Sequence, residues 1–287
     1  MPIPCGFRAR SGYHETLPER VMPAAPDSNV ASLPPPRWMR HVESRVYTDD
    51  AHLDREREAV FGRSWWIAAR SDAVARPGDF AVLDELGESL LIVRDDRGVV
   101  RAFHNNCRHR GSRLLDGSGH IDAIDCPYHG WKYGLDGRAS WIPRPEGLQG
   151  RLSGRTGLDA VRTAEWGGFV WVCLAAEPPE LPTFLSGLTD ELAPYRLTEF
   201  EPIQHKTFVL DCNWKALVEN VTDFYHVPFV HKNTIAAHVP VGPDIKSYGD
   251  HTRQRLDIAQ YGWRRAFDRR CSRGGPYDTR QISALHK

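Results

Sequence analysis

The most constraining feature of this 287-residue chain is a short segment, residues 107–131, that holds two cysteine–histidine pairs. Cys107 is followed two positions later by His109. After sixteen intervening residues, Cys126 is followed three positions later by His129. Both pairs lie among turn-forming residues, so each of two loops offers one thiolate and one imidazole at close range. Two facing loops of this kind predict a site with two sulfur and two nitrogen ligands.

Two kinds of metal centre use such a ligand set. A [2Fe–2S] cluster of the Rieske type has two cysteines on one iron and two histidines on the other, which suits mixed pairs from two facing loops. A Cys2His2 zinc site is the alternative, but zinc fingers usually separate the cysteine pair from the histidine pair. The mixed pairs therefore favour the cluster. Pro127 and Gly130 shape a tight covering loop, and we expect the hydroxyl of Tyr128 to tune the cluster through a hydrogen bond.

Composition limits the remaining possibilities. The chain has 37 basic and 37 acidic residues, so its net charge indicates neither a nucleic-acid nor a membrane-surface partner. No apolar run approaches the length of a membrane span, and no signal sequence follows Met1. Apart from Cys107 and Cys126, the cysteines show no disulfide spacing, which favours free thiols in the cytoplasm. Cys173 lies in an apolar run and is expected in the core.

We expect an α+β fold with four regions. Residues 1–46 form a proline-rich arm, because prolines at this density exclude a regular helix or a central strand. Residues 47–61 form a helix with Thr48 as its N-cap. Residues 62–175 contain short β-branched runs separated by turns, which predicts a small antiparallel β domain that carries the cluster. Residues 180–287 form a second, catalytic domain.

Within the β region, apolar and β-branched runs predict individual strands. These runs are residues 80–83, 89–93, 99–103 and 168–174. Residues 95–98, Asp-Asp-Arg-Gly, are expected to form a hairpin turn between two of them. In the second region we expect a short helix over residues 184–195 and a strand over residues 206–210.

Residues 213–231, NWKALVENVTDFYHVPFVH, form the second informative segment. Its apolar residues recur at helical spacing, which predicts an amphipathic helix. Asp223 and His226 are one turn apart on the opposite side, and His231 follows within reach after Pro228. Two histidines and a carboxylate on one face of a metal ion are the ligands of non-haem Fe(II) oxygenases. The alternative is a solvated helix face, but the neighbouring cluster motif favours the metal site.

Together these motifs resemble those of the catalytic (α) subunits of the Rieske non-haem iron ring-hydroxylating oxygenases. The resemblance begins near Tyr47, covers both motifs and fades after about His238. It implies [2Fe–2S] and Fe(II) as cofactors, with the cluster ligands Cys107, His109, Cys126 and His129 and the Fe(II) ligands His226 and His231. Asp223 takes the place of a carboxylate that, in the family, links an iron-ligand histidine to a cluster histidine of the neighbouring subunit in a ring of three.

The resemblance implies the terminal oxygenase component of a multicomponent system. An NAD(P)H-dependent reductase, directly or through a ferredoxin, would supply electrons for the reduction of O₂ beside a bound substrate. The expected products are hydroxylated, dihydroxylated or demethylated forms of a small substrate, with an aromatic compound preferred. The spacing from Asn220 to Asp223 resembles that of monooxygenase-like relatives that act on aromatic acids or quaternary amines.

One departure from the family concerns the third iron ligand. The family takes it, usually an aspartate, from a large curved antiparallel sheet packed by helices, in a helix-grip-like domain. Only 56 residues follow His231, so we expect a shortened catalytic domain, and we assign none of the candidates Asp244, Asp250, Asp257, Asp268 and Asp278.

The shortened second domain leaves other interpretations open. The chain would then be a Rieske-type electron carrier or an inactive, truncated oxygenase. A zinc-stabilised interaction module is the non-enzymatic interpretation. For the oxygenase we expect a well-occupied cluster, poorly held mononuclear iron, and exposed apolar surface on the second domain.

Overall fold

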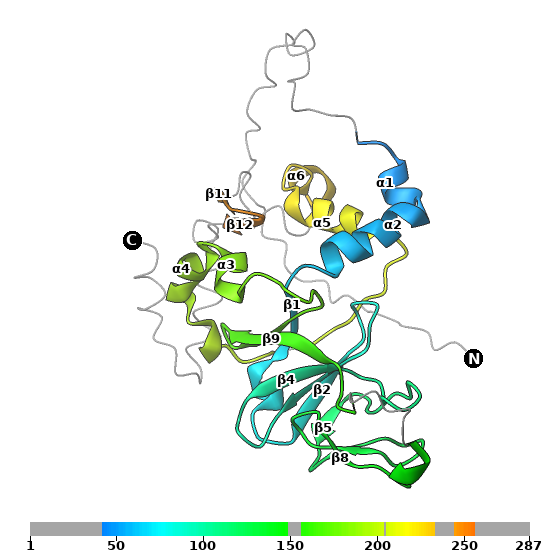
Figure 1. The fold of residues 1–287 in the computed structure, drawn as a ribbon. Coiled ribbons are helices and arrows are strands. Elements are labelled where there is room, and N and C mark those ends of the chain that lie inside the picture. Colours follow the sequence, from blue (N-terminus) through cyan, green and yellow to red (C-terminus); the bar gives the residue numbers. More distant parts are fainter. Residues whose placement is uncertain (1–41, 149–155, 204, 233–243, 256–287) are drawn as a thin grey trace, which may run out of the picture. The chain divides into compact units, whose positions relative to one another are not determined.

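The structure is a computed structural model that describes residues 42–148, 156–203, 205–232 and 244–255. The described residues form an α+β fold, as predicted (Figure 1). The predicted N-terminal arm lies outside the described residues as far as residue 41. The helices are α1 (Arg45–Thr48), α2 (Asp50–Glu56), α3 (Leu181–Leu185), α4 (Leu188–Leu192), α5 (Trp214–Thr222) and α6 (Val227–Val230).

The strands fall into three antiparallel sheets. They are β1 (Trp66–Arg70), β2 (Asp79–Leu83), β3 (Leu90–Arg94), β4 (Val100–His104), β5 (Ser118–His120), β6 (Ile124–Asp125), β7 (Lys132–Tyr133), β8 (Ala139–Trp141), β9 (Ala160–Trp166), β10 (Phe169–Cys173), β11 (Asp244–Tyr248) and β12 (His251–Arg255). The larger sheet has the order β1-β10-β9-β4-β3-β2-β5, the second the order β6-β7-β8, and β11 pairs with β12. The predicted strands at residues 80–83, 89–93, 99–103 and 168–174 correspond to β2, β3, β4 and β10.

The central strand β3 separates two hydrophobic cores. Its residues Leu90 to Val93 are fully buried, and alternate side chains point to opposite faces of the sheet. Leu90 and Ile92 pack in one core with Val74 and residues of β9 and β10. Leu91 and Val93 pack in the other, which also contains both cysteines of the motif. The candidate cluster site is therefore built on one of the two cores of the β region.

The loop between β3 and β4 is the hairpin turn predicted at residues 95–98. The N–H of Gly98 donates to the carbonyl of Asp95 at 2.9 Å, and Gly98 has a φ of 78°, a left-handed conformation that favours glycine. The buried Asp95 carboxylate accepts from the N–H groups of Arg97 and Val99 and from the Arg101 side chain. The turn is thus held by side-chain as well as backbone bonds.

The helix predicted over residues 47–61 is divided into three helical segments, α1, α2 and a π-helical turn. Asp49 has an extended backbone between α1 and α2, and its carboxylate accepts from the N–H of Ala51 at 2.9 Å. The N-cap is therefore Asp49, where the sequence predicted Thr48. The last turn, Arg57–Phe61, is π-helical. The extended backbone of Asp49 ends α1. Its side-chain carboxylate starts α2, because it accepts a hydrogen bond from a backbone N–H that has no partner within the helix.

The second region differs from the prediction in three places. The helix expected over residues 184–195 is broken between α3 and α4, where Ser186 has a φ of 53°. The strand expected over residues 206–210 is absent: the described residues 206–210 form no regular element, and Val209 is almost fully exposed. The helix expected from Asn213 to the disturbance at Pro228 ends earlier, at Thr222, and is followed by the separate turn α6.

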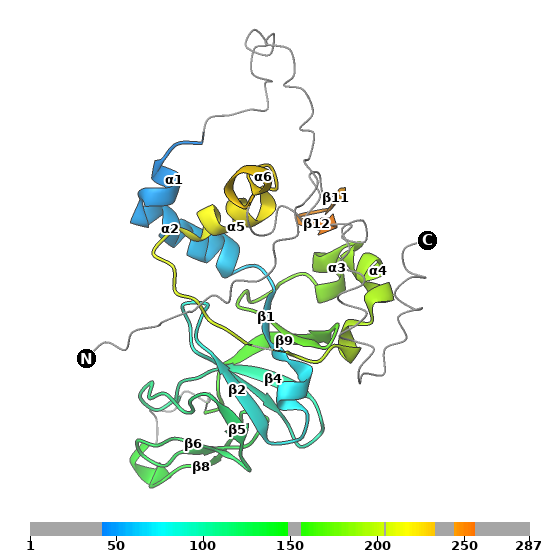
Figure 2. The ribbon, with the colours of Figure 1, turned by 180° about the vertical axis from the view of Figure 1, so that it is seen from behind.

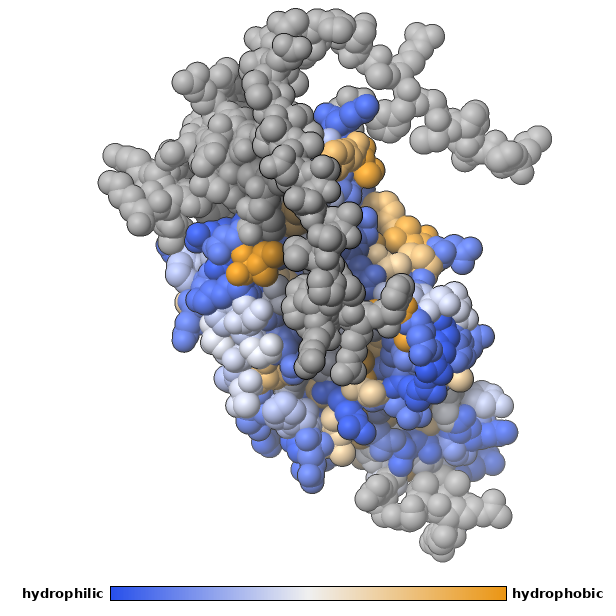
Figure 3. Space-filling model, turned by 90° about the horizontal axis from the view of Figure 1, so that it is seen from above, coloured by the Kyte–Doolittle hydropathy of each residue, from blue (hydrophilic) through white to orange (hydrophobic). Residues whose placement is uncertain are grey.

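Apolar side chains are exposed on this second region. Figure 3 shows hydrophobic patches on the surface of the described residues. Exposed side chains of α5, α6 and the preceding segment are Ile203, Phe208, Val209, Leu217, Val221, Phe229 and Val230. The amphipathic face predicted for α5 therefore exists, but beyond Trp214 it is left largely uncovered by the described residues. Within the described ranges, no helix combines the length and apolar character that a membrane crossing needs.

Candidate iron–sulfur and mononuclear iron sites

The first cysteine–histidine pair lies in the loop that follows β4. The N–H of Cys107 donates to the carbonyl of Ser112 at 2.8 Å, and the Cys107 carbonyl accepts from the N–H of Gly111 at 2.8 Å. Gly111 has a φ of 71°, which favours glycine over residues with a side chain. These two bonds close a tight turn that carries Cys107 and His109.

The second pair lies between β6 and β7, in a loop with the same backbone pattern. The N–H of Cys126 donates to the carbonyl of Trp131 at 2.8 Å, and the Cys126 carbonyl accepts from the N–H of Gly130 at 3.0 Å. Gly130 has a φ of 70°, nearly the value of Gly111. The two loops are thus equivalent in backbone structure, although their histidines follow the cysteines at different distances.

The imidazoles of both loops belong to a row of aromatic rings. The ring centroids of His109 and His129 are 4.6 Å apart. His109 stacks on the buried ring of Trp131 at 5.2 Å with the planes nearly parallel. The ring of His129 contacts that of Tyr128 at a tilt of 34° with the centroids 3.7 Å apart, and the guanidinium of Arg110 lies 5.7 Å from the centre of the Tyr128 ring. One end of the row is therefore in the core, whereas the other, at His129 and Tyr128, is exposed.

A buried hydroxyl lies next to the first cysteine. Tyr133 Oη is 3.1 Å from Cys107 Sγ and also accepts from the N–H of Arg108 at 3.1 Å. Tyr128, which the sequence predicted for this role, is 57% exposed and contacts the ring of His129 instead. Strand periodicity in the sequence could have pointed to Tyr133. It follows the buried Trp131 by two residues, and alternate residues of a strand share one face.

The second cysteine is surrounded by hydrogen-bond donors. Burial acts to raise the pKa of Cys126, but backbone N–H groups of His129 and Tyr128 and the Ser112 side chain lower it below its ordinary value. A thiolate is the form that binds metal, and donors aimed at the sulfur stabilise it. Ser112 comes from the first loop, so the first loop supports the sulfur ligand of the second.

The chemistry of these four side chains fits a [2Fe–2S] cluster. Cys107 and Cys126 are buried free thiols that interact with each other. Burial, then the charges of His129 and Arg110, lower the pKa of His109 and keep its ring in the neutral, metal-binding form. His109 Nδ1 is buried and has no hydrogen-bond partner among the described residues. A buried ring nitrogen without a partner beside two buried thiols is accounted for by a metal ligand role.

Two residues that are not predicted ligands stabilise the first loop. Asn105, also buried, accepts from the N–H groups of Leu114 and Leu115 and donates to the Leu115 carbonyl at 2.7 Å. Arg113 forms a bidentate pair with Asp84 on the loop between β2 and β3, with nitrogen–oxygen distances of 2.9 and 2.8 Å. Neither residue was singled out from the sequence, because no local pattern shows which backbone groups Asn105 meets or that Arg113 reaches Asp84.

The second candidate site lies at the turn between α5 and α6. Asp223 ends α5 with an extended backbone, and its carboxylate accepts from the N–H of Tyr225 at 2.7 Å. Its other oxygen, Oδ2, lies 3.4 Å from His226 Nδ1. The contact predicted between Asp223 and His226 is therefore present, but a turn forms it where the sequence predicted one continuous helix face.

His226 and His231 flank the single turn α6, as its N-cap and C-cap. Their ring centroids are 5.3 Å apart and their planes are steeply inclined. An imidazole nitrogen lies about 2.1 Å from a bound metal ion, so two rings at this separation can bind one ion. The structure therefore places these two histidines side by side, and their role as ligands of one metal ion stays a prediction.

No group of three histidine, cysteine, aspartate or glutamate side chains in the described ranges is arranged to hold one metal ion. For the cluster this is expected, because each iron takes only two protein ligands. For the mononuclear site it means that a third ligand is not found there. Asp244 is engaged by Arg253 at 2.7 Å and Arg255 at 3.2 Å, and Asp250 lies exposed between β11 and β12. The candidates Asp257, Asp268 and Asp278 lie outside the described residues.

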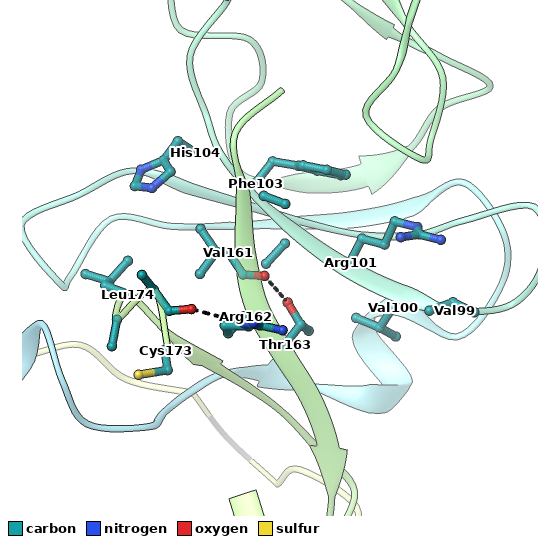
Figure 4. A pocket seen from close by; sticks show the side chains of 14 residues that line it. Val99, Val100, Arg101, Phe103, His104, Val161, Arg162, Thr163, Cys173 and Leu174 are labelled. Atoms are coloured by element: carbon teal, nitrogen blue, oxygen red, sulfur yellow. Dashed lines mark hydrogen bonds between the residues drawn. The ribbon is translucent and has the colours of Figure 1, made fainter. Parts of the chain in front are cut away.

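A hollow of about 670 Å³ lies elsewhere, where β4 and β9 diverge. The two strands pair only at Ala102 with Val161 and at Phe103 with Ala160. Figure 4 shows that its lining comes from β4, β9 and the end of β10. None of the predicted ligands lines it. Cys173, at its edge, is buried as predicted and contacts the Arg63 carbonyl.

Two family models match the chain in the regions that hold these sites. Residues 64–152 match the Rieske [2Fe-2S] domain, and residues 197–276 match the catalytic domain of the ring hydroxylating alpha subunit. The chain belongs to the Rieske non-haem iron oxygenases, as a ring-hydroxylating catalytic (α) subunit. Proteins of this family use a [2Fe–2S] cluster in the first domain and mononuclear non-haem Fe(II) in the second.

Individual relatives are oxygenases of two substrate classes. The glycine betaine monooxygenase oxygenase subunit of Chromohalobacter salexigens is 32% identical over 72% of this chain and 47% of its own length. A quaternary ammonium Rieske monooxygenase, whose structure bears on carnitine oxidation and inter-subunit electron transfer, aligns with a TM-score of 0.69 and 26% identity, over 74% of this chain and 58% of its own. A naphthalene 1,2-dioxygenase variant aligns with a TM-score of 0.57 and 30% identity, over 64% and 43%. This chain spans about half the length of the curated relatives it matches.

Proposed function

We propose that this chain is the oxygenase component of a Rieske monooxygenase that acts on a small quaternary ammonium compound. The observation that carries the proposal is the presence, in one chain, of two equivalent cysteine–histidine loops and of the His226–His231 turn with its attached carboxylate. The similarity to glycine betaine and carnitine monooxygenase subunits supports the substrate class. An aromatic substrate is the second candidate, supported by the similarity to naphthalene 1,2-dioxygenase.

Each candidate ligand has a defined role in this proposal. The cluster would be held by Cys107, His109, Cys126 and His129, and Fe(II) by His226 and His231. When bound, the cluster supplies one-electron transfer and the Fe(II) supplies the reduction of O₂. The chain's own residues position these groups: Tyr133 and Ser112 donate toward the sulfurs, and the loop backbones hold the cysteines in place.

Asp223 orients His226 in this proposal. Its Oδ2 faces His226 Nδ1 at 3.4 Å, so we assign the ring proton to Nδ1, which leaves Nε2 for the metal. The bond from Tyr225 N–H fixes the carboxylate in the turn. The side chain of Asp223 is half exposed, so the same carboxylate is accessible to a histidine of another subunit.

We further propose that electrons enter and leave the cluster at His129, the exposed imidazole of the row. An NAD(P)H-dependent reductase or a ferredoxin would donate them, and Asp223 of a second copy in a trimer would bridge His129 to the His226 of that copy, which would hold the electron-accepting Fe(II). The inter-subunit electron transfer described for the quaternary ammonium monooxygenase supports this arrangement.

The test uses the purified full chain. We expect about two irons and two acid-labile sulfides per chain for the cluster, with its visible absorption and the paramagnetic signal of its reduced state. Cys107→Ser and His129→Ala should lose both signals. His104→Ala is the matched control, because His104 lies on β4 and pairs with Glu88, and it should retain them. Retention of both signals in either ligand variant would refute the assignment.

The substrate class is tested by single turnover of the chemically reduced protein with O₂. Glycine betaine, carnitine and choline form one set of substrates, and naphthalene and benzoate form the other. Product formation from the quaternary ammonium set alone supports the proposal, whereas product from the aromatic set alone supports the second candidate. A loaded chain that forms no product from either set would support an electron carrier.

A further inference from the structure

The N-terminal helical segment, residues 45–61, precedes both regions matched by family models and has no part in the proposed chemistry. It nevertheless contacts the beginning of α5, more than 150 residues later in the chain. Asn213, the N-cap of α5, donates from Nδ2 to the carbonyl of Tyr47 at 3.2 Å. The hydroxyl of Tyr47 donates to Glu219 Oε1 at 2.7 Å, nearly two turns farther along α5. α1 is thus bonded to both ends of this helix.

Glu56 at the end of α2 makes the strongest of these contacts. Its carboxylate accepts from Trp214 Nε1 at 2.9 Å and from Lys215 Nζ at 2.8 Å. His52 Nε2 lies 3.1 Å from its other oxygen. The side chains of Glu56 and Lys215 are only 12% and 16% exposed. Charge-assisted hydrogen bonds that are shielded from water are the strong class of such contacts.

Burial opposes ionisation of Glu56, but hydrogen bonds from Lys215 and Trp214 outweigh it and lower the pKa of the carboxyl. Lys215 is itself enclosed: its Nζ also donates to Asn213 Oδ1 at 2.8 Å and lies 5.4 Å from the ring centre of Tyr47. Removal of Glu56 would therefore leave a largely buried lysine without its counter-charge, which is costly.

Phe61 connects the same contact to the cluster domain. Its ring stacks on Trp66 of β1 at 5.1 Å and meets Trp214 of α5 edge-on at 5.2 Å. Trp66 Nε1 also donates to the Phe61 carbonyl at 2.8 Å. Phe61 ends the π-helical turn, an irregularity that is often found at functional sites. The ring thus lies between the first strand of the cluster domain and the helix that leads to Asp223, His226 and His231.

We propose that the N-terminal helical segment is part of the mononuclear iron site, and that Glu56 is a positioning residue that holds α5 and the ligand turn after it through Trp214 and Lys215. The effect of Glu56 on the ligand turn rests on the proposed function. Its effect on the position of α5 does not. Figures 1 and 2 both show α2 and α5 side by side. Neither family match includes Glu56, and its partners Trp214 and Lys215 lie at the first turn of α5.

The test compares three variants of the full chain with the parent chain by hydrogen–deuterium exchange. Glu56→Gln removes the charge but keeps the size. Glu56→Lys combined with Lys215→Glu reverses the pair and restores it. Glu58→Gln, an exposed neighbour on the next turn, is the matched control. We expect Glu56→Gln to raise exchange in α5 about tenfold, since the lost bond is to a charged group. The reversed pair should recover part of the protection, because it restores the ion pair but offers no acceptor to Trp214 Nε1. The control should match the parent chain.

A second readout is the affinity for Co(II), used as a spectroscopic probe of His226 and His231. Glu56→Gln should weaken binding by up to about tenfold, the low end of the loss seen when outer partners of metal ligands are removed. The cluster absorption should not change. If the parent chain binds no Co(II), the proposed mononuclear site fails, while exchange in α5 still decides the attachment.

Two results would overturn the inference. One is unchanged exchange in α5 in Glu56→Gln, or an equal rise in Glu58→Gln. The other is a rise that extends to β3 and β4, because the ion pair would then stabilise the whole chain and would not act on α5 in particular. Co(II) affinity that is unchanged despite faster exchange in α5 would refute the link from Glu56 to the ligand turn.

Discussion

The buried hydroxyl of Tyr133 makes the cluster's reduction potential a quantitative test of the proposed ligands. Tyr133 has no exposed surface, and its Oη lies 3.1 Å from Cys107 Sγ. Burial, followed by the interaction with Cys107, raises the pKa of Tyr133 far above its usual range, so the phenol keeps its proton. A neutral phenol next to a cluster sulfur donates a hydrogen bond to it. Tyr133→Phe removes this donor and keeps the ring.

The size of the expected shift in reduction potential follows from the negative charge that reduction adds to the cluster. A hydrogen bond to a charged group contributes about 1 kcal/mol more than one to a neutral group. Reduction makes the sulfur more negative, so the bond from Tyr133 favours the reduced cluster by an amount of this order. For a one-electron couple, about 1.4 kcal/mol corresponds to 59 mV. We therefore expect Tyr133→Phe to lower the potential by roughly 40 mV.

The measurement is a redox titration followed by circular dichroism or by the paramagnetic signal of the reduced cluster. Tyr128→Phe is the matched control, because its hydroxyl belongs to a largely exposed ring that contacts the ring of His129. It should shift the potential by far less. An unchanged or higher potential in Tyr133→Phe, or an equal shift in the control, would contradict the reasoning. Some loss of stability is expected as well, since the N–H of Arg108 loses its acceptor.

Three further predictions concern the ligand turn and the first loop. Asp223→Asn should keep both metals yet lower turnover roughly 10- to 100-fold, because it removes the charged partner of His226; full product formation would exclude the bridging role. A chelator should remove mononuclear iron, held in the described residues by His226 and His231 alone, before the cluster absorption changes; simultaneous loss would argue against two separate sites. The bond from Arg113, then that from Ser89, lowers the pKa of Asp84 to about 2 from 3.8, so stability from this pair is complete above pH 3.8 and is lost as the pH falls toward 2. In Asp84→Asn, acid unfolding followed by cluster absorption should lose this dependence; an unchanged profile would show that the pair does not anchor the loop.

The β region was largely predictable from the sequence because local patterns and tertiary packing agree there. Residues 90–93 are apolar on both faces, which is typical of a strand covered on both sides, and all four are fully buried in β3. The turn at residues 95–98 has the Asp and Gly that its backbone requires. The strand expected at residues 206–210 has the same β-branched and aromatic composition but no partner strand among the described residues, so composition alone was misleading.

The candidate site was predictable in its ligands but not in its supports. Spacing within each loop brings a thiol and an imidazole together whatever the surrounding fold. The supports, Asn105, Arg113 and Tyr133, act through partners from other elements, and only the folded chain shows them. At the second site, helical periodicity brought Asp223 near His226, but it did not reveal that the Asp223 carboxylate ends α5 and bonds to the following turn.

The equivalence of the two cluster loops has a consequence for their assembly and for their variation. Each loop is closed by its own pair of backbone bonds, neither of which involves a ligand side chain. Reconstitution with iron and sulfide should therefore not require refolding. Of the sixteen residues between His109 and Cys126, only Gly111 and Ser112 take part in these backbone bonds. An insertion at the exposed Asp122 should leave the ligands in place, which makes the separation of the two pairs the least constrained part of the motif. The physical constraint lies in the left-handed residue four positions after each cysteine.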